Sequence, residues 1–146
     1  MSAIVVGVDG SEGSIRALRF AVEEARIRDA ELRVVHAWHI PPAIYGSGWA
    51  PAPVDLDEYR KLAEVSLART LADGGADDAG LAVTPVLHEG DAVEVLCAEA
   101  AHADLIVVGS RGLGGFRGLL LGSVSQQVVQ QATRPVVVVQ QPATAP

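Results

Sequence analysis

The chain has 146 residues, of which 49% are hydrophobic and 4% aromatic, and this is enough apolar material for one domain with one core. Eighteen acidic residues against eleven basic ones give a net charge of -7, which argues against nucleic acid and anionic membranes as partners. The single cysteine, Cys97, excludes an internal disulfide and a cysteine-based zinc site, and its apolar neighbours indicate inert packing. No apolar run approaches the ~18 residues of a membrane span and the first residues lack a secretory pattern, so we expect a cytoplasmic protein.

Strands and helices alternate in the first half of the chain. Residues 3–9 form an almost continuously apolar run, which is typical of a parallel strand that is buried on both faces. Residues 14–28 then carry apolar side chains at helical spacing, and residues 31–37 repeat the strand pattern. The segment 39–55 is rich in proline and glycine, so we expect a long loop there.

The second half continues the alternation. Asp55-x-x-Glu58 has the spacing of a capping box and predicts a helix that ends near Gly74 and Gly75. The other predicted elements are a strand at 81–88, a helix that begins at Asp91, a strand at 104–109, a glycine-rich loop at 110–122, a helix at about 123–133, a strand at 135–139 and a frayed tail at 140–146.

This order of elements predicts the fold class. Five strands that alternate with four helices indicate a single α/β domain over residues 1–146, because parallel strands need crossover connections. We expect a doubly wound, Rossmann-like domain with a five-stranded parallel sheet in the order 3-2-1-4-5, flanked by four helices. Ligands of such sheets bind beyond the carboxyl ends of the strands, where the strand order reverses. The loops after the first and fourth strands are therefore the candidate site.

A glycine-rich motif follows the fourth predicted strand. Gly109-Ser110-Arg111-Gly112 is followed, after nine residues, by Gly122-Ser123. Glycines let backbone N–H groups approach a phosphate, and the N-terminus of the next helix adds unpaired donors and a favourable dipole. The alternative interpretation is structural: Ser123-x-x-Gln126 has capping-box spacing, and the glycines then only make a flexible loop.

Other phosphate-binding motifs are absent from the sequence. No glycine precedes Lys-Ser or Lys-Thr, so the Walker A lysine is missing and a conventional P-loop NTPase is excluded. An acid, Asp9, stands where the dinucleotide fingerprint has its second glycine, which argues against NAD. We assign structural or surface roles, and no metal site, to the four histidines, at positions 36, 39, 88 and 102.

The glycine spacing resembles the ATP-binding signature of the universal stress protein family, and the similarity extends over nearly the whole chain. Further stretches that resemble the family are IVVGVDGS at 4–11, VVHA at 34–37, DLIVVGS at 104–110 and RPVVVV at 134–139.

This resemblance implies a set of nucleotide-binding residues and a cofactor, ATP, with or without Mg²⁺. Asp9 would lie beside the nucleotide, although Asp is also a common turn cap, and Val8 and Ala37 would line the adenine region. The residues implied to hold the ribose and phosphates are Gly109, Arg111, Gly112, Gly122 and Ser123, with Val124 and Ser125 extending the cradle.

Three functions are compatible with these residues. The first is a nucleotide-responsive regulatory or binding module in stress response, because the motif lacks a positioned base or lysine; no catalytic residue is then assigned. The second is a slow ATPase or a self-phosphorylating protein, in which Asp9 helps to place Mg²⁺ and Ser123 or Ser125 receives phosphate. The third is a dimeric interaction protein that works without nucleotide. Both the resemblance and the four consecutive valines of the last strand predict a homodimer through Pro135 to Val139.

Overall fold

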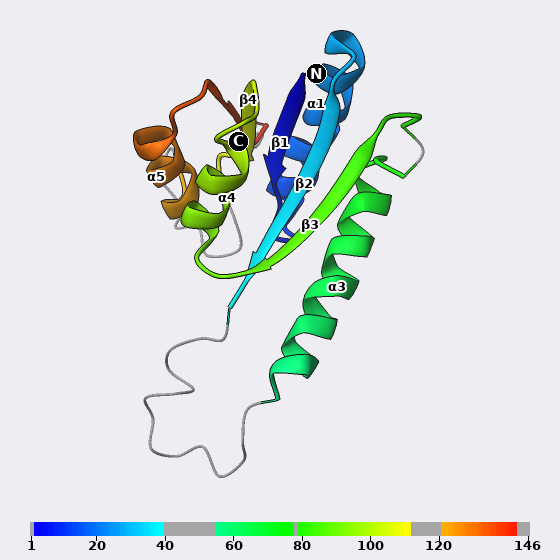
Figure 1. The fold of residues 1–146 in the computed structure, drawn as a ribbon, viewed down its shortest axis with the longest axis vertical. Helices are drawn as coiled ribbons and strands as arrows, with labels where there is room; N and C mark the ends of the chain where they lie inside the picture. The colour runs from blue at the N-terminus through cyan, green and yellow to red at the C-terminus, as the bar shows by residue number, and fades with distance from the viewer. Residues whose placement is uncertain (1, 40–54, 78, 112–120, 143–146) are drawn as a thin grey trace.

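The computed structural model describes residues 2–39, 55–77, 79–111 and 121–142. Within these ranges five parallel strands form one sheet in the order β3-β2-β1-β4-β5 (Figure 1). The strands are β1 (Ala3–Gly7), β2 (Glu31–Trp38), β3 (Val83–Glu89), β4 (Leu105–Gly109) and β5 (Val136–Val139). The helices of the described ranges are α1 (Glu12–Arg28), α3 (Leu56–Asp73), α4 (Ala92–Ala100) and α5 (Ser123–Gln131). The predicted fold class and strand order are confirmed.

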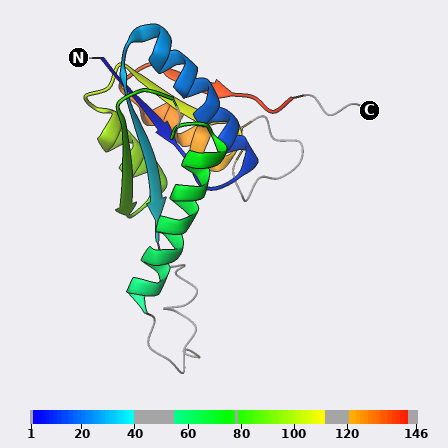
Figure 2. The ribbon, with the colours of Figure 1, turned by 90° about the vertical axis from the view of Figure 1, so that its right-hand side faces the viewer.

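Helices cover both faces of the sheet (Figures 1 and 2). One core cluster places Ile4 and Val6 of β1 against α1 and α3, and the other places Val5 against α4 and α5. Successive side chains of a strand point to opposite faces, so a strand covered on both sides must be apolar at every position. This burial on both faces explains why the sequence of β1 is a continuous apolar run.

The strand order reverses between β1 and β4. Val6 of β1 lies opposite Val34 of β2 on one side and Val107 of β4 on the other. The chain leaves β1 through α1 toward β2, and it leaves β4 through α5 toward β5, in the opposite direction. The carboxyl ends of β1 and β4 therefore border the position where sheets of this type bind ligands.

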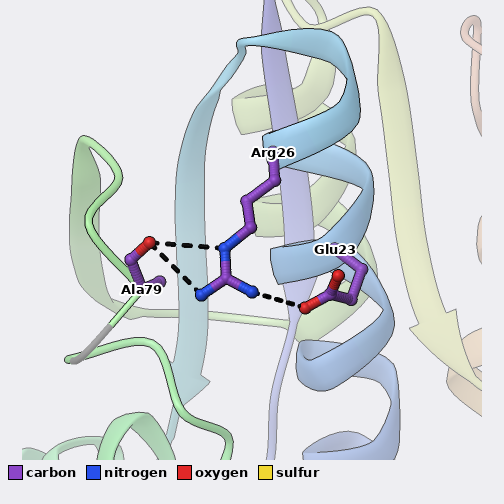
Figure 3. Close-up of polar contacts among 3 residues, drawn as sticks. All are labelled: Glu23, Arg26 and Ala79. Carbon is purple, nitrogen blue, oxygen red and sulfur yellow. Dashed lines mark hydrogen bonds and ion pairs between the residues drawn. The ribbon is translucent and has the colours of Figure 1, made fainter.

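Polar contacts of Arg26 fix the far end of α1. Its Nε and Nη2 atoms donate to the carbonyl of Ala79 at 3.4 and 3.3 Å, and Nη1 pairs with Glu23 at 2.6 Å (Figure 3). Ala79 lies in the connection between α3 and β3. The Arg26 side chain thus joins the last turn of α1 to this connection, at the end of the sheet opposite the candidate site.

Some boundaries differ from the sequence prediction. β1 ends at Gly7, so Val8 and Asp9 lie beyond the strand, and β3 begins at Val83, two residues later than expected. Most of the predicted loop at 39–55 and the end of the predicted tail lie outside the described residues. None of the described helices has the length and apolar character that crossing a bilayer requires.

Candidate functional site

Asp9 closes the turn between β1 and α1. Its Oδ1 atom accepts hydrogen bonds from the backbone N–H and the hydroxyl of Ser11, at 2.9 and 2.5 Å. Its own N–H donates to Oγ of Ser14 at 3.3 Å, and Ser11 in turn caps the N-terminus of α1. The turn-capping role that the sequence left open for Asp9 is confirmed. A role beside a nucleotide stays a prediction.

Val8, directly after β1, and Ala37, near the end of β2, lie at the same end of the sheet. The N–H of Val8 donates to the carbonyl of Val35 at 2.9 Å, which continues the pairing of β1 with β2 past the last residue of β1. The Val8 side chain packs in the core cluster under α1 and α3, and that of Ala37 packs against the cluster under α4. The two side chains therefore take opposite faces of the sheet, at the same end of it.

Two glycines allow the start of α1 to touch the end of β4. A Cβ atom on Gly109 would lie 2.8 Å from the carbonyl oxygen of Gly13, and a Cβ on Gly13 would lie 2.6 Å from the carbonyl oxygen of Arg111. Real Cβ atoms do not approach backbone atoms this closely, so both positions require glycine for packing. Gly109 is thus needed by the protein itself, independently of any ligand.

The loop after β4 returns to its starting point at α5. The carbonyl of Ser110 accepts from the N–H of Gly122 at 2.5 Å and from the hydroxyl of Ser125 at 3.0 Å. The N–H of Ser110 donates to the carbonyl of Val139 in β5 at 2.9 Å. These bonds bring both ends of the glycine motif together at the end of the sheet. Gly112 lies outside the described residues, and Arg111 is partly buried beside Gly13.

Gly122, and not Ser123, is the N-cap of α5. Gly122 has φ -72° and ψ 171°, Ser123 is the first helical residue, and among the described residues no side-chain hydrogen bond caps this end of the helix. The capping-box interpretation of Ser123 is therefore wrong. By contrast, side chains of Ser11, Asp55 and Asp91 cap α1, α3 and α4.

An uncapped helix start presents its first N–H groups without intrahelical partners. In α5 these groups belong to Ser123, Val124 and Ser125, and the first two residues are exposed. Ser125 is only 3% exposed, and its hydroxyl bonds to the carbonyls of Ser110 and Gly122. The sequence interpretation of Ser125 as a phosphate acceptor therefore conflicts with its burial. The backbone N–H of Ser125, rather than its hydroxyl, is the group that could donate to a phosphate.

The structure adds residues that sequence reasoning missed. Gly13 and Ser14 build the contact between α1 and the two candidate loops, and the buried His36 donates from Nδ1 to the Val8 carbonyl at 2.9 Å. The sequence places Gly13 and Gly109 far apart, and nothing in either segment alone predicts that they touch.

The described residues hold no group of three or more His, Cys, Asp or Glu side chains that could bind a metal ion. Partial burial raises the pKa of the Cys97 thiol, which lowers its thiolate fraction at neutral pH. Cys97 packs against the cluster under α4, as the sequence predicts for an inert residue.

Residues 1–140 match the model of the universal stress protein family. The universal stress protein Rv2623 of Mycobacterium tuberculosis is 36% identical over 141 residues, which cover 97% of this chain and 46% of that protein. The universal stress protein Mb2028c of Mycobacterium bovis is 38% identical over 138 residues, 94% of this chain and 45% of the relative. The chain spans about half the length of these curated relatives.

Solved structures share the fold over nearly the full length. A universal stress protein in complex with cAMP is 28% identical, with a TM-score of 0.67 over 95% of this chain and 96% of that one. The universal stress protein from Archaeoglobus fulgidus in complex with dAMP is 26% identical, with a TM-score of 0.71 over 95% of this chain and 98% of that one. Because the family model matches residues 1–140, nearly the whole chain, this chain belongs to the universal stress protein family.

Proposed function

We propose that this chain is a nucleotide-responsive regulatory module that binds an adenine nucleotide, ATP foremost, where the strand order of its sheet reverses. One observation carries the proposal: the uncapped start of α5 lies at the end of β4, joined to it by the Gly122–Ser110 hydrogen bond. Unpaired N–H groups and the positive end of a helix dipole attract phosphate. The complexes of related proteins with cAMP and dAMP support an adenine nucleotide as the ligand.

The residues fit such a ligand. Gly122 has no side chain over the first N–H groups of α5, so a phosphate could approach Ser123 and Val124 from solvent. Gly109 and Arg111 border the same position from the end of β4, and Gly112 completes the proposed set from outside the described residues. Val8 and Ala37, at the ends of β1 and β2, are the proposed neighbours of the adenine.

The second candidate is a slow ATPase or a self-phosphorylating protein, in which the nucleotide supplies a transferable phosphoryl group. The exposure of Ser123 at the start of α5 favours Ser123 over the buried Ser125 as the acceptor in such a protein. Phosphoryl transfer depends on fixed positive charge around the terminal phosphate. In the described part of the site the cations are Arg111, within the glycine motif, and Arg16, whose Nη2 atom would lie 3.8 Å from a Cβ on Gly13. The Walker A lysine is missing from the sequence, so we expect binding to exceed turnover. Asp9 is the residue proposed to meet Mg²⁺, if the nucleotide carries one.

A homodimer through β5 belongs to the same proposal. β5 is an edge strand of the described sheet, and its four valines are all partly buried. The other edge strand, β3, contains Pro85, which lacks a backbone donor and blunts that edge. We propose that β5 pairs with a second copy, and that the dimer works in the cytoplasm.

Calorimetric titration with ATP and with GTP tests the binding function. We expect about one ATP per chain and much weaker binding of GTP, because the adenine and guanine edges present different donors and acceptors. Hydrolysis measured on the same sample should stay below the ordinary enzyme range, under about 1 per second. A protein that binds no adenine nucleotide refutes the proposal, and ordinary turnover replaces it with the enzymatic alternative.

A further inference from the structure

We propose that His36 is a positioning residue of the nucleotide site, because its imidazole fixes the peptide group that joins Val8 to Asp9. The inference rests on the proposed nucleotide function. The sequence assigned His36 only a structural or surface role, and the bond from its Nδ1 atom to the Val8 carbonyl now gives it a specific task.

The contact lies where β1 leaves the sheet. The pairing of β1 with β2 runs to Gly7 opposite Val35, and the N–H of Val8 adds one more bond to β2. Beyond that bond, the Val8 carbonyl accepts from the His36 ring at 2.9 Å. A side chain of β2 thus provides the donor where the regular backbone pairing ends.

Both partners of this bond are shielded from water. His36 is 9% exposed and Val8 is 7% exposed. A carbonyl oxygen can only accept, so Nδ1 must carry the hydrogen. Removal of the ring donor would leave a buried carbonyl without its hydrogen bond, and the peptide would turn to find another donor.

The same peptide group is held at its other edge. The carbonyl of Val8 and the N–H of Asp9 belong to one rigid plane. The N–H donates to Oγ of Ser14 in α1 at 3.3 Å, while the carbonyl accepts from His36 in β2. Two side chains from different elements therefore fix the rotation of this plane, and the plane sets the direction in which Asp9 leaves the strand.

Rotation of this peptide would spread into the candidate site. Asp9 bonds to Ser11, the N-cap of α1, so the direction of Asp9 is coupled to the start of this helix. The first turn of α1 also carries Gly13, whose carbonyl oxygen lies against Gly109. His36 thereby acts on the nucleotide through the Val8–Asp9 peptide without touching the nucleotide.

Four variants of the full chain test this inference: His36→Asn, His36→Gln, His36→Leu and Val34→Ala. The amide nitrogen of Asn can take the place of Nδ1, whereas that of Gln extends toward the place of Nε2. Comparison of these two variants therefore distinguishes a need for a donor at the Nδ1 position from a general need for a polar side chain. Val34 is a fully buried neighbour on the same face of β2, and its truncation loosens the sheet without removing a donor. The affinity for ATP is measured by calorimetry, and folding by circular dichroism and thermal unfolding.

We expect His36→Asn to bind ATP within about threefold of the natural protein, and His36→Gln and His36→Leu to bind about tenfold more weakly. Val34→Ala should unfold at a lower temperature but keep its affinity. The inference is wrong if Asn and Gln weaken binding equally, if both leave it unchanged, or if Val34→Ala weakens it as much as Gln does. Failure of the natural protein to bind ATP would instead reject the proposed function itself.

Discussion

Gly122 is the residue on which the proposed phosphate contact depends most directly. Its φ of -72° is open to any amino acid, so the strain that a positive φ would have imposed on a substitution does not arise. What glycine provides here is space, because a side chain at the N-cap would stand over the first N–H groups of α5. Because Gly122 is itself buried, a side chain there should cost some stability as well as ligand binding.

We expect Gly122→Val to weaken ATP binding by about a hundredfold or more. Phosphate contacts of this kind contribute roughly 1.5 to 3 kcal/mol each, and a branched side chain would block two of them. Calorimetry measures the loss, and circular dichroism checks that the variant folds. Val129→Ala, which alters an exposed residue farther along α5, is the matched control and should bind normally. A folded Gly122→Val protein with natural affinity would show that the glycine segment is only a loop.

Sequence reasoning located both ends of the glycine motif but could not describe the contacts between segments. The apolar run of β4 and the following glycines predict a loop at the end of the sheet. The sequence did not predict that Gly122 occupies the N-cap position of α5, because Ser123-x-x-Gln126 matches the capping-box spacing. The contacts of His36 with Val8 and of Gly13 with Arg111 depend on register and crossover geometry, which local patterns do not contain.

Among the elements, α1 and β4 meet more closely than ordinary side chains allow. The first turn of α1 contacts the end of β4 through the backbones at Gly13 and Gly109. This contact places the N-terminal half of α1 beside the proposed nucleotide position. Glycine in a helix costs about 0.5–1 kcal/mol relative to alanine, so the close approach must offset that loss.

Gly13→Ala should destabilise the protein by about 1–3 kcal/mol, the usual cost of forcing extra atoms into a packed site. Helix propensity alone predicts the opposite sign. Urea unfolding measures the change in the free energy of unfolding. Ala68→Gly, at an exposed position in α3, reports the ordinary glycine cost in this protein. A gain in stability for Gly13→Ala would mean that the backbones separate easily and that the contact does not constrain the site.

Element order was predictable because each strand and helix carries its own periodic pattern. The boundaries of the strands and helices were less predictable, because the residue at which an element ends depends on tertiary contacts. β1 stops at Gly7, although the apolar run continues through Val8, because the chain turns away to be held by His36 and Ser14. A hydrophobicity pattern contains no information about that change of chain direction.

For the whole molecule, the exposed edge of β5 predicts association. The carbonyls of Pro135 and Val139 accept from the N–H groups of Ile106 and Ser110, so by the parallel pattern Val136 and Val138 direct their backbone groups away from β4. Among the described strands none pairs with this edge, so we propose that these outward groups bond to a second copy.

Light scattering should give twice the chain mass of 15.2 kDa at micromolar concentration. Val138→Pro should shift the protein toward monomer, because it removes an outward N–H while sparing the bonds to β4. Val129→Ala, on the exposed surface of α5, is the control and should remain dimeric. A natural protein that scatters as a monomer, or a Val138→Pro variant that stays dimeric, contradicts association through this edge.

Identification of the nucleotide that the purified protein carries tests the central claim most directly. The protein is freed of loose ligand, incubated with a mixture of adenine and guanine nucleotides, separated from the excess, denatured and analysed by chromatography. We predict release of an adenine nucleotide at close to one per chain, and little guanine nucleotide. Release of no nucleotide, or of guanine and adenine nucleotides in equal amounts, would contradict a specific adenine-nucleotide site at the ends of β1 and β4.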